Sequence, residues 1–189
     1  MTLTETGILA ATSGIGEGGS VHVVANNQVI LSNSYIEMQT SGKETGAGQG
    51  GNLTVQAADI HLRQSNITTE TAGIAQGGSI QLAADNQTTF NDSQINLKVS
   101  DQSMLDGDGG KGNGGDLVIQ AADVTFTNGS LVNATTLGAG QGGSVNLQAT
   151  HQIQLDGSTT SISSSSHGPG KAGFITLQGA NLLLSLIHI

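Results

Sequence analysis

A Gly-Gly pair recurs along this chain, and the recurrence constrains the fold more than any other feature of the sequence. Successive copies, counting a degenerate Ala172-Gly173 at the end, are 32, 27, 37, 28 and 30 residues apart. Internal repeats of this length are typical of solenoids, propellers and arrays, in which each repeat is one supersecondary unit. The five pairs that directly precede an alternating segment are Gly18-Gly19, Gly50-Gly51, Gly77-Gly78, Gly114-Gly115 and Gly142-Gly143.

Apolar or small residues follow each pair and alternate with polar ones. A period of two predicts strands with one buried face. The alternation is interrupted twice in each copy, which predicts three short strands, two tight turns and a variable loop that ends at the glycine pair. The first turn carries Asn or Asp, as in Asn26-Asn27 and Asp85-Asn86, and these residues tolerate turn conformations. We expect the glycines to serve as turn residues as well.

The copies align residue by residue. Copies one, three and five place their apolar positions at the same offsets from the glycine pair, whereas copies two and four lack one residue after a shared Ala. The aligned third segments are Ser34, Ile36 and Met38 in copy one, Ser65 and Ile67 in copy two, Ser93, Ile95 and Leu97 in copy three, Gly129 and Leu131 in copy four, and Ser158, Thr160 and Ile162 in copy five.

One copy cannot bury its own apolar row, but stacked copies can. At a strand spacing of ~4.8 Å, equivalent residues form continuous ladders, and parallel pairing satisfies the backbone groups. The crossover rule favours a right-handed coil. The prediction is an all-β, right-handed, single-stranded parallel β-helix (a solenoid) of about five to six coils with three short strands each. A β-propeller needs four strands per blade, and a leucine-rich repeat needs a longer leucine signature.

Composition restricts the partners. A formal charge of −9 and only five Lys and Arg argue against nucleic acid and against anionic membranes, since both repel an acidic chain. The apolar tail at 181–189 is too short to span a membrane as a helix. Aromatic residues make up 2% of the chain and Cys is absent, so we expect an aliphatic core without disulfides.

Two segments carry a family resemblance. The sequences GAGQGGNLTVQAADIHLRQSNIT (46–68) and GAGQGGSVNLQATHQIQLDGSTTSIS (138–163) resemble the shaft repeats of filamentous-haemagglutinin-like exoproteins, which Gram-negative bacteria secrete by the two-partner route. The resemblance covers about 14–183. The Asn-Pro motifs of the family's secretion domain are missing, since Pro169 is the only proline and follows Gly168.

The resemblance implies passage through an outer-membrane transporter, folding outside the cell and a location that is secreted or at the cell surface. It therefore predicts a non-catalytic structural shaft of a large bacterial adhesin, with a host-cell or polysaccharide surface as a further partner. Two alternatives stay open: a fragment of an extracellular β-helical enzyme that acts on polysaccharides, and a calcium-stabilised exoprotein repeat.

The repeat also suggests boundaries. We expect a β-helix segment over 1–183 that is truncated at both ends, because 3–16 resembles the last strand and loop of an earlier copy. Residues 184–189 depart from the repeat and match the in-frame translation of a transposon-end adapter that is common in sequencing libraries. We predict that these six residues are not native.

The sequence predicts no catalytic residue, no cofactor site and no enzyme. Three strings fit G-x-G-x-x-G (14–19, 46–51 and 138–143) but precede strands, whereas a dinucleotide site opens a helix. Nine of the ten outward positions on the first strands lack a carboxylate, so no acid–base pair is expected there. The acidic loop at 106–116 is the one place with a set of hard oxygen ligands for calcium, contributed by Asp106, Asp108 and Asp116.

Overall fold

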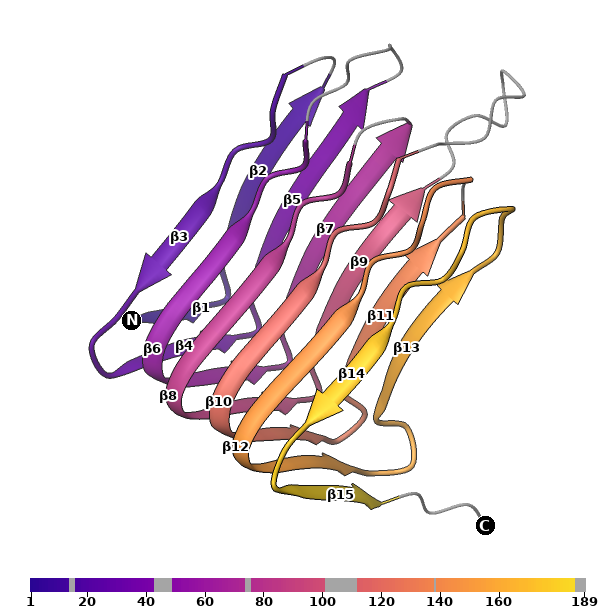
Figure 1. Ribbon diagram of the computed structural model, residues 1–189. Helices are drawn as coiled ribbons and strands as arrows, with labels where there is room; N and C mark the ends of the chain where they lie inside the picture. The colour runs from indigo at the N-terminus through magenta and orange to yellow at the C-terminus, as the bar shows by residue number, and fades with distance from the viewer. Residues whose placement is uncertain (14–15, 43–48, 74–75, 101–111, 138, 186–189) are drawn as a thin grey trace.

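The chain winds into a parallel β-solenoid, seen in a computed structural model that describes residues 1–13, 16–42, 49–73, 76–100, 112–137 and 139–185. All strand pairs in these residues are parallel, and no helix is present among them. The strands nearest the viewer in Figure 1 run downward, those behind run upward, and the coils advance from left to right, which makes the coil right-handed. The predicted right-handed parallel β-helix is confirmed.

Each coil has three sides. The first two sides belong to one nine-stranded sheet, and the third side is a six-stranded sheet in the order β13-β11-β9-β7-β5-β2. The strands of the first sheet are β1 (Thr2–Thr4), β3 (Val21–Val24), β4 (Gln28–Ser32), β6 (Leu53–Arg63), β8 (Ile80–Asn91), β10 (Leu117–Thr127), β12 (Val145–Asp156), β14 (Ile175–Gln178) and β15 (Asn181–Ser185). Those of the second are β2 (Gly7–Ser13), β5 (Tyr35–Gly42), β7 (Asn66–Gly73), β9 (Gln94–Ser100), β11 (Leu131–Thr136) and β13 (Ser161–Ser166).

The first predicted turn is a bend rather than a break in four coils. β6, β8, β10 and β12 each cover the first and second sides as one long strand, whereas β3 and β4 are separate strands that both pair with β6. The register shifts at the bend, for example between Ala57 and Asp59. This shift absorbs the one-residue difference between copies without interrupting the parallel pairing.

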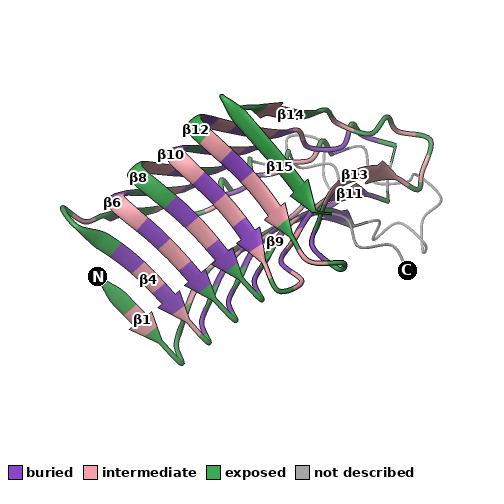
Figure 2. Ribbon diagram, turned by 90° about the horizontal axis from the view of Figure 1, so that it is seen from below, coloured by how far each residue is buried: buried purple, intermediate pink, exposed green. Residues whose placement is uncertain are grey.

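Aliphatic ladders fill the interior. Leu53, Ile80, Leu117 and Val145 occupy equivalent positions in successive coils and are all buried. Figure 2 shows the same alternation of buried and more exposed residues repeated from strand to strand. Phe90 and Phe126 form one aromatic step in such a ladder, with their rings stacked at a centroid distance of 4.4 Å. The predicted aliphatic core is therefore confirmed, with this aromatic pair inside it.

The glycine pairs have a different role from the one predicted. None of them has a positive φ among the described residues, so they are not needed for the left-handed conformation that favours glycine in turns. Instead, the backbones of neighbouring coils nearly touch at each pair. A Cβ on Gly115 would overlap the carbonyl oxygen of Gly78, and a Cβ on Gly77 would overlap the backbone nitrogen of Gly115. Glycine is required there because only a residue without Cβ permits so close an approach.

The corner between the second and third sides carries the left-handed residues. Asn33, Gln64, Asp92 and Asn128 occupy this corner in successive coils, with φ between 47° and 54°. A serine follows directly in three of these coils, and its backbone N–H donates a hydrogen bond to the hydroxyl of a serine in the next coil. The three bonds, Ser34 N to Ser65 Oγ, Ser65 N to Ser93 Oγ and Ser93 N to Ser130 Oγ, each measure 3.2 Å.

The predicted alignment of the third segment is wrong in copies four and five. Ile95 pairs with Val132 rather than Leu131, and Val132 pairs with Ile162. Ile162 is therefore equivalent to Ile36 and not to Met38. The reason is that the corner is longer there: Ser130 N–H donates to the carbonyl of Thr127, and Thr160 N–H donates to that of Gly157, which closes wider turns.

The two ends of the described chain fit the solenoid. β1 and β2 pair in register with β4 and β5. At the other end, Leu184 and Ser185 complete β15 opposite Leu155 and Asp156, while residues 186–189 lie outside the described residues. The adapter origin of 184–189 stays a prediction.

Candidate functional site

The G-x-G-x-x-G strings lie at the return of the chain to the first side. Their described glycines lead into β3, β6 and β12, and their backbones stack on neighbouring coils as described above. A phosphate cradle requires that the motif open a helix, which does not happen in any described stretch. The strings therefore serve coil stacking.

The candidate calcium ligands are only partly within the described residues. Asp106 and Asp108 lie outside them. Asp116 Oδ1 accepts a hydrogen bond of 2.8 Å from the backbone N–H of Ser144 in the next coil. Asn52 makes the same contact, at 2.9 Å, with Ser79. The side chain of Asp116 is thus engaged in joining two coils, and calcium binding by this loop stays an untested alternative to the prediction of no metal site.

The charged side chains of the outer surface are scattered. Lys98 lies 3.6 Å from Glu70 on the third side, and His151 Nδ1 lies 3.8 Å from Asp123 near the bend. His61 Nδ1 is hydrogen-bonded to Thr89 Oγ1 at 2.7 Å. Across the residues that the structure describes, no group of three or more His, Asp or Glu is close enough to hold a metal ion.

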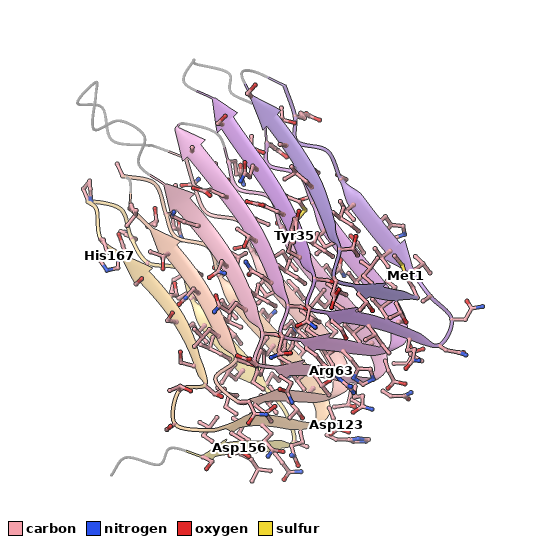
Figure 3. The ribbon with its side chains drawn as sticks, turned by 180° about the vertical axis from the view of Figure 1, so that it is seen from behind. Met1, Tyr35, Arg63, Asp123, Asp156 and His167 are labelled. Atoms are coloured by element: carbon pink, nitrogen blue, oxygen red, sulfur yellow. The ribbon has the colours of Figure 1, made fainter. Side chains whose placement is uncertain are left out.

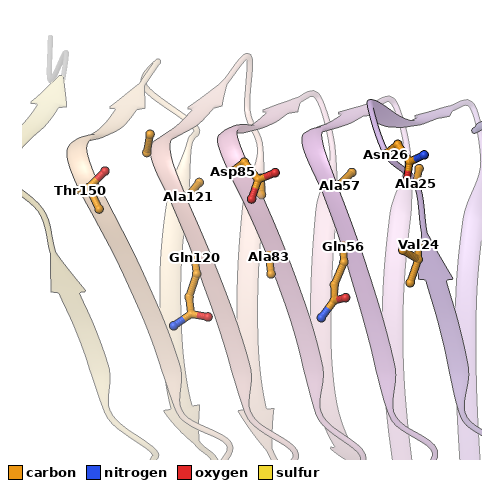
Figure 4. A pocket seen from close by; sticks show the side chains of 12 residues that line it. Val24, Ala25, Asn26, Gln56, Ala57, Ala83, Asp85, Gln120, Ala121 and Thr150 are labelled. Carbon is orange, nitrogen blue, oxygen red and sulfur yellow. The ribbon is translucent and has the colours of Figure 1, made fainter.

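One hollow follows the bend between the first and second sides. It has a volume of about 730 Å³ and crosses five coils, from Val24 in β3 to Thr150 in β12. Alanines such as Ala57 and Ala121 form its floor, and Gln56 and Gln120 project beside it (Figure 4). Gln120 Nε2 donates to Gln148 Oε1 in the next coil at 2.9 Å. The small alanines leave this hollow, which a larger residue would fill.

A second hollow of about 700 Å³ follows the corner between the second and third sides. Three successive coils line it, and most of its side chains are polar and reach solvent. Arg63, at one end, is labelled in Figure 3. The lining residues are Arg63 and Gln64 from the first of these coils, Thr89, Phe90, Asn91 and Asp92 from the second, and Thr125, Thr127 and Asn128 from the third. The sequence analysis missed this groove because its geometry depends on the left-handed corner.

A third, smaller hollow of about 410 Å³ lies on the third side around Asn96 and Lys98, between Thr68 and Leu137. Asn96 Nδ2 donates to Asn66 Oδ1 across the coils at 3.0 Å. Glu70, Leu97, Asn133 and Thr135 complete its lining.

Comparison with known proteins identifies no relative. No family model, no curated protein and no solved structure matches this chain. The described part of the chain also contains no helix with the length and apolar character that a membrane crossing requires.

Proposed function

We propose that this chain is a non-catalytic structural shaft of a large secreted or surface-attached bacterial exoprotein. The observation that carries the proposal is the uninterrupted stacking of equivalent residues along the solenoid, from β2 to β13 on the third side. The apolar rows of neighbouring coils join in one core, so the same contacts that stabilise the fold resist bending and extension. Such a solenoid is a rod whose length grows with each added coil.

The outer surface supports a passive role. Its rows are mainly Ser, Thr, Asn and Gln, and its few charges are dispersed over different sides. Acid–base catalysis needs two positioned carboxyl groups on one face, and the described outward positions of the first side hold a single one, Asp116. The resemblance of the repeats to filamentous-haemagglutinin-like shafts supports secretion through an outer-membrane transporter.

Deletion of one complete coil tests the rod. Removal of residues 51–77 joins Gly50 to Gly78 and keeps all three ladders in register. Removal of 51–64 takes out about half a coil and leaves the register broken, so it serves as the control. We expect the first variant to unfold cooperatively with nearly unchanged midpoint and the second to lose its native circular dichroism. If the first variant were already unfolded under native conditions, the shaft would not be modular.

Location and catalysis need separate tests. Immunogold labelling with antibodies against the chain should decorate intact cells of the source bacterium, and label seen only after permeabilisation would overturn the surface location. Incubation with neutral and acidic polysaccharides should yield no new reducing ends. Turnover that is lost on replacing one carboxylate, such as Asp116→Asn, would establish the enzyme alternative instead.

A further inference from the structure

We propose that the corner groove lined by Arg63, Gln64, Asn91, Asp92 and Asn128 binds a straight, neutral, β-1,4-linked glycan that lies along the solenoid axis. This inference goes beyond a mechanical role and does not depend on where the shaft is located. It names a site and a ligand class for the outer surface.

The groove is constructed by the backbone rather than by mobile side chains. Gln64, Asp92 and Asn128 are held in the left-handed region, with φ of 47°, 49° and 54°. The serine ladder directly behind these residues fixes the corner: Ser65 and Ser93 are both buried, and Ser93 N–H donates to Ser130 Oγ behind the wider corner that contains Asn128. Three side chains therefore form a row at the corners that directly follow β6, β8 and β10, at the coil spacing of ~4.8 Å.

Hydrogen bonds between the coils orient these side chains and leave binding capacity free. Gln64 Nε2 donates to Asp92 Oδ2 at 3.5 Å, and Asn128 Nδ2 donates to Asn91 Oδ1 at 3.2 Å. Within the described residues, Asp92 Oδ1, Asn128 Oδ1 and the NH2 group of Asn91 form no hydrogen bond, and all three residues are exposed. The groove thus offers acceptors from Asp92 and Asn128 and a donor from Asn91 to a ligand.

This chemistry suits a sugar chain. Hydroxyl groups donate and accept hydrogen bonds, so they match amides and a carboxylate that face them in the same row. One β-1,4-linked hexose unit is about as long as one coil step, so each unit meets one coil. Arg63 and Asp92 balance each other's charge within the groove, while the net charge of −9 disfavours polyanionic glycans.

Glycine adopts a positive φ without strain, so substitution with glycine at these corners removes a side chain and leaves the backbone unchanged. Asp92→Gly and Asn128→Gly remove the side chains and keep the backbone conformation without strain. Asn33→Gly is the matched control, because Asn33 has the same φ region (48°) in a neighbouring coil but does not line the groove. Circular dichroism melts of all three variants verify that each is folded.

Cellohexaose is the probe, titrated into the protein and followed by amide chemical shifts. We expect saturable shifts at the groove residues, weakened at least about tenfold in the Asp92→Gly/Asn128→Gly double variant and unchanged in Asn33→Gly. Maltohexaose, whose α-1,4 chain curves, should not bind saturably. Absence of saturable cellohexaose binding, shifts confined to other sides of the solenoid, equal binding of maltohexaose, or undiminished binding by the double variant would each overturn the proposal.

Discussion

At the scale of single residues, the backbones of neighbouring coils approach one another so closely at the glycine pairs that nearly every added Cβ would overlap backbone atoms. Gly115 meets the carbonyl of Gly78, Gly143 meets that of Gly115, and the first glycine of each pair meets the next coil in the same way. The N–H groups there also bond across the coils, as in Gly77 N to Asn113 O at 2.7 Å. The glycine pairs thus form a ladder of their own beside the sheets.

Gly115→Ala should therefore destabilise the protein severely. The added methyl group overlaps backbone atoms, which cannot rotate away as a side chain can, so we expect a loss of at least about 3 kcal/mol in the free energy of unfolding, measured by urea denaturation. Gly19→Ala is the matched control at the same repeat position, because its nearest neighbour would be Ala10 Cβ at 3.6 Å. Equal destabilisation by both substitutions would contradict the close-approach explanation.

Thr88 is a polar residue in an otherwise aliphatic ladder. It is fully buried in a row with Val29, Ile60, Val124 and Ile153, and its hydroxyl has no hydrogen-bond partner. Thr88→Val replaces the hydroxyl with a methyl group of similar size. Because a buried, unpaired polar group is costly, we expect a gain of about 1 kcal/mol in the free energy of unfolding.

The control for Thr88→Val is Thr125→Val, which points outward in the next coil and should change stability by less than about 0.5 kcal/mol. Thermal melts compare the melting temperatures of both variants with that of the unchanged protein. A lower melting temperature for Thr88→Val than for the unchanged protein would show that the hydroxyl contributes to stability.

At the scale of elements, the corner before the third side sets the shape of the coil. One left-handed residue and the serine after it redirect the chain, and the serine hydroxyl also donates to the carbonyl two residues earlier, as in Ser93 Oγ to Asn91 O at 2.9 Å. The same hydroxyl thus closes its own turn and joins the previous coil. The bend at the first corner needs no such device, since the strand continues through it.

Ser93→Ala should weaken two coils at once. It leaves the buried N–H of Ser65 without its acceptor and should cost about 1–3 kcal/mol in the free energy of unfolding. Ser79→Ala, at an exposed position on the first side, should be nearly neutral. Hydrogen exchange gives a second measurement: the amide of Ser65 should exchange faster in Ser93→Ala only.

At the scale of the whole molecule, the described chain ends in open sheet edges. β14 and β15 pair on one side only, and Phe174, Leu182 and Leu184 are exposed there. β1, β2 and β3 are likewise paired on one side. Unpaired edges with exposed apolar side chains are templates for association.

A polypeptide of these 189 residues should accordingly self-associate. We expect its weight-average mass in sedimentation equilibrium to rise with concentration. Leu182→Lys together with Leu184→Lys places charges on the edge and should lower the mass toward that of a monomer. If the unsubstituted polypeptide stayed monomeric at high concentration, the unpaired edges would not mediate self-association.

Much of the fold is encoded locally. Each copy shows a period of two, as around Leu53 and Leu117, and the glycine pairs recur between the copies. This pattern is visible within each copy alone, and it predicts parallel stacked strands. The alignment of the third segments in copies four and five could not be predicted from the sequence pattern. Ser130 and Thr160 close wider corners than Ser93 does. Because these corners contain extra residues, counting positions from the glycine pair gives the wrong alignment after them. The register there is set by which apolar residues, Val132 and Ile162, meet across the coils.

The sequence by itself determined the architecture, because a repeated apolar row that no single copy can bury leaves stacking as its only solution. It also determined an outer surface of amides and hydroxyls with little charge. Tertiary structure alone decided the role of the glycines, the merging of two strands into one bent strand and the groove beside Asp92. These depend on distances between coils, and a residue's neighbour in the next coil is about 27 to 37 positions away in the chain, where no local pattern reveals it.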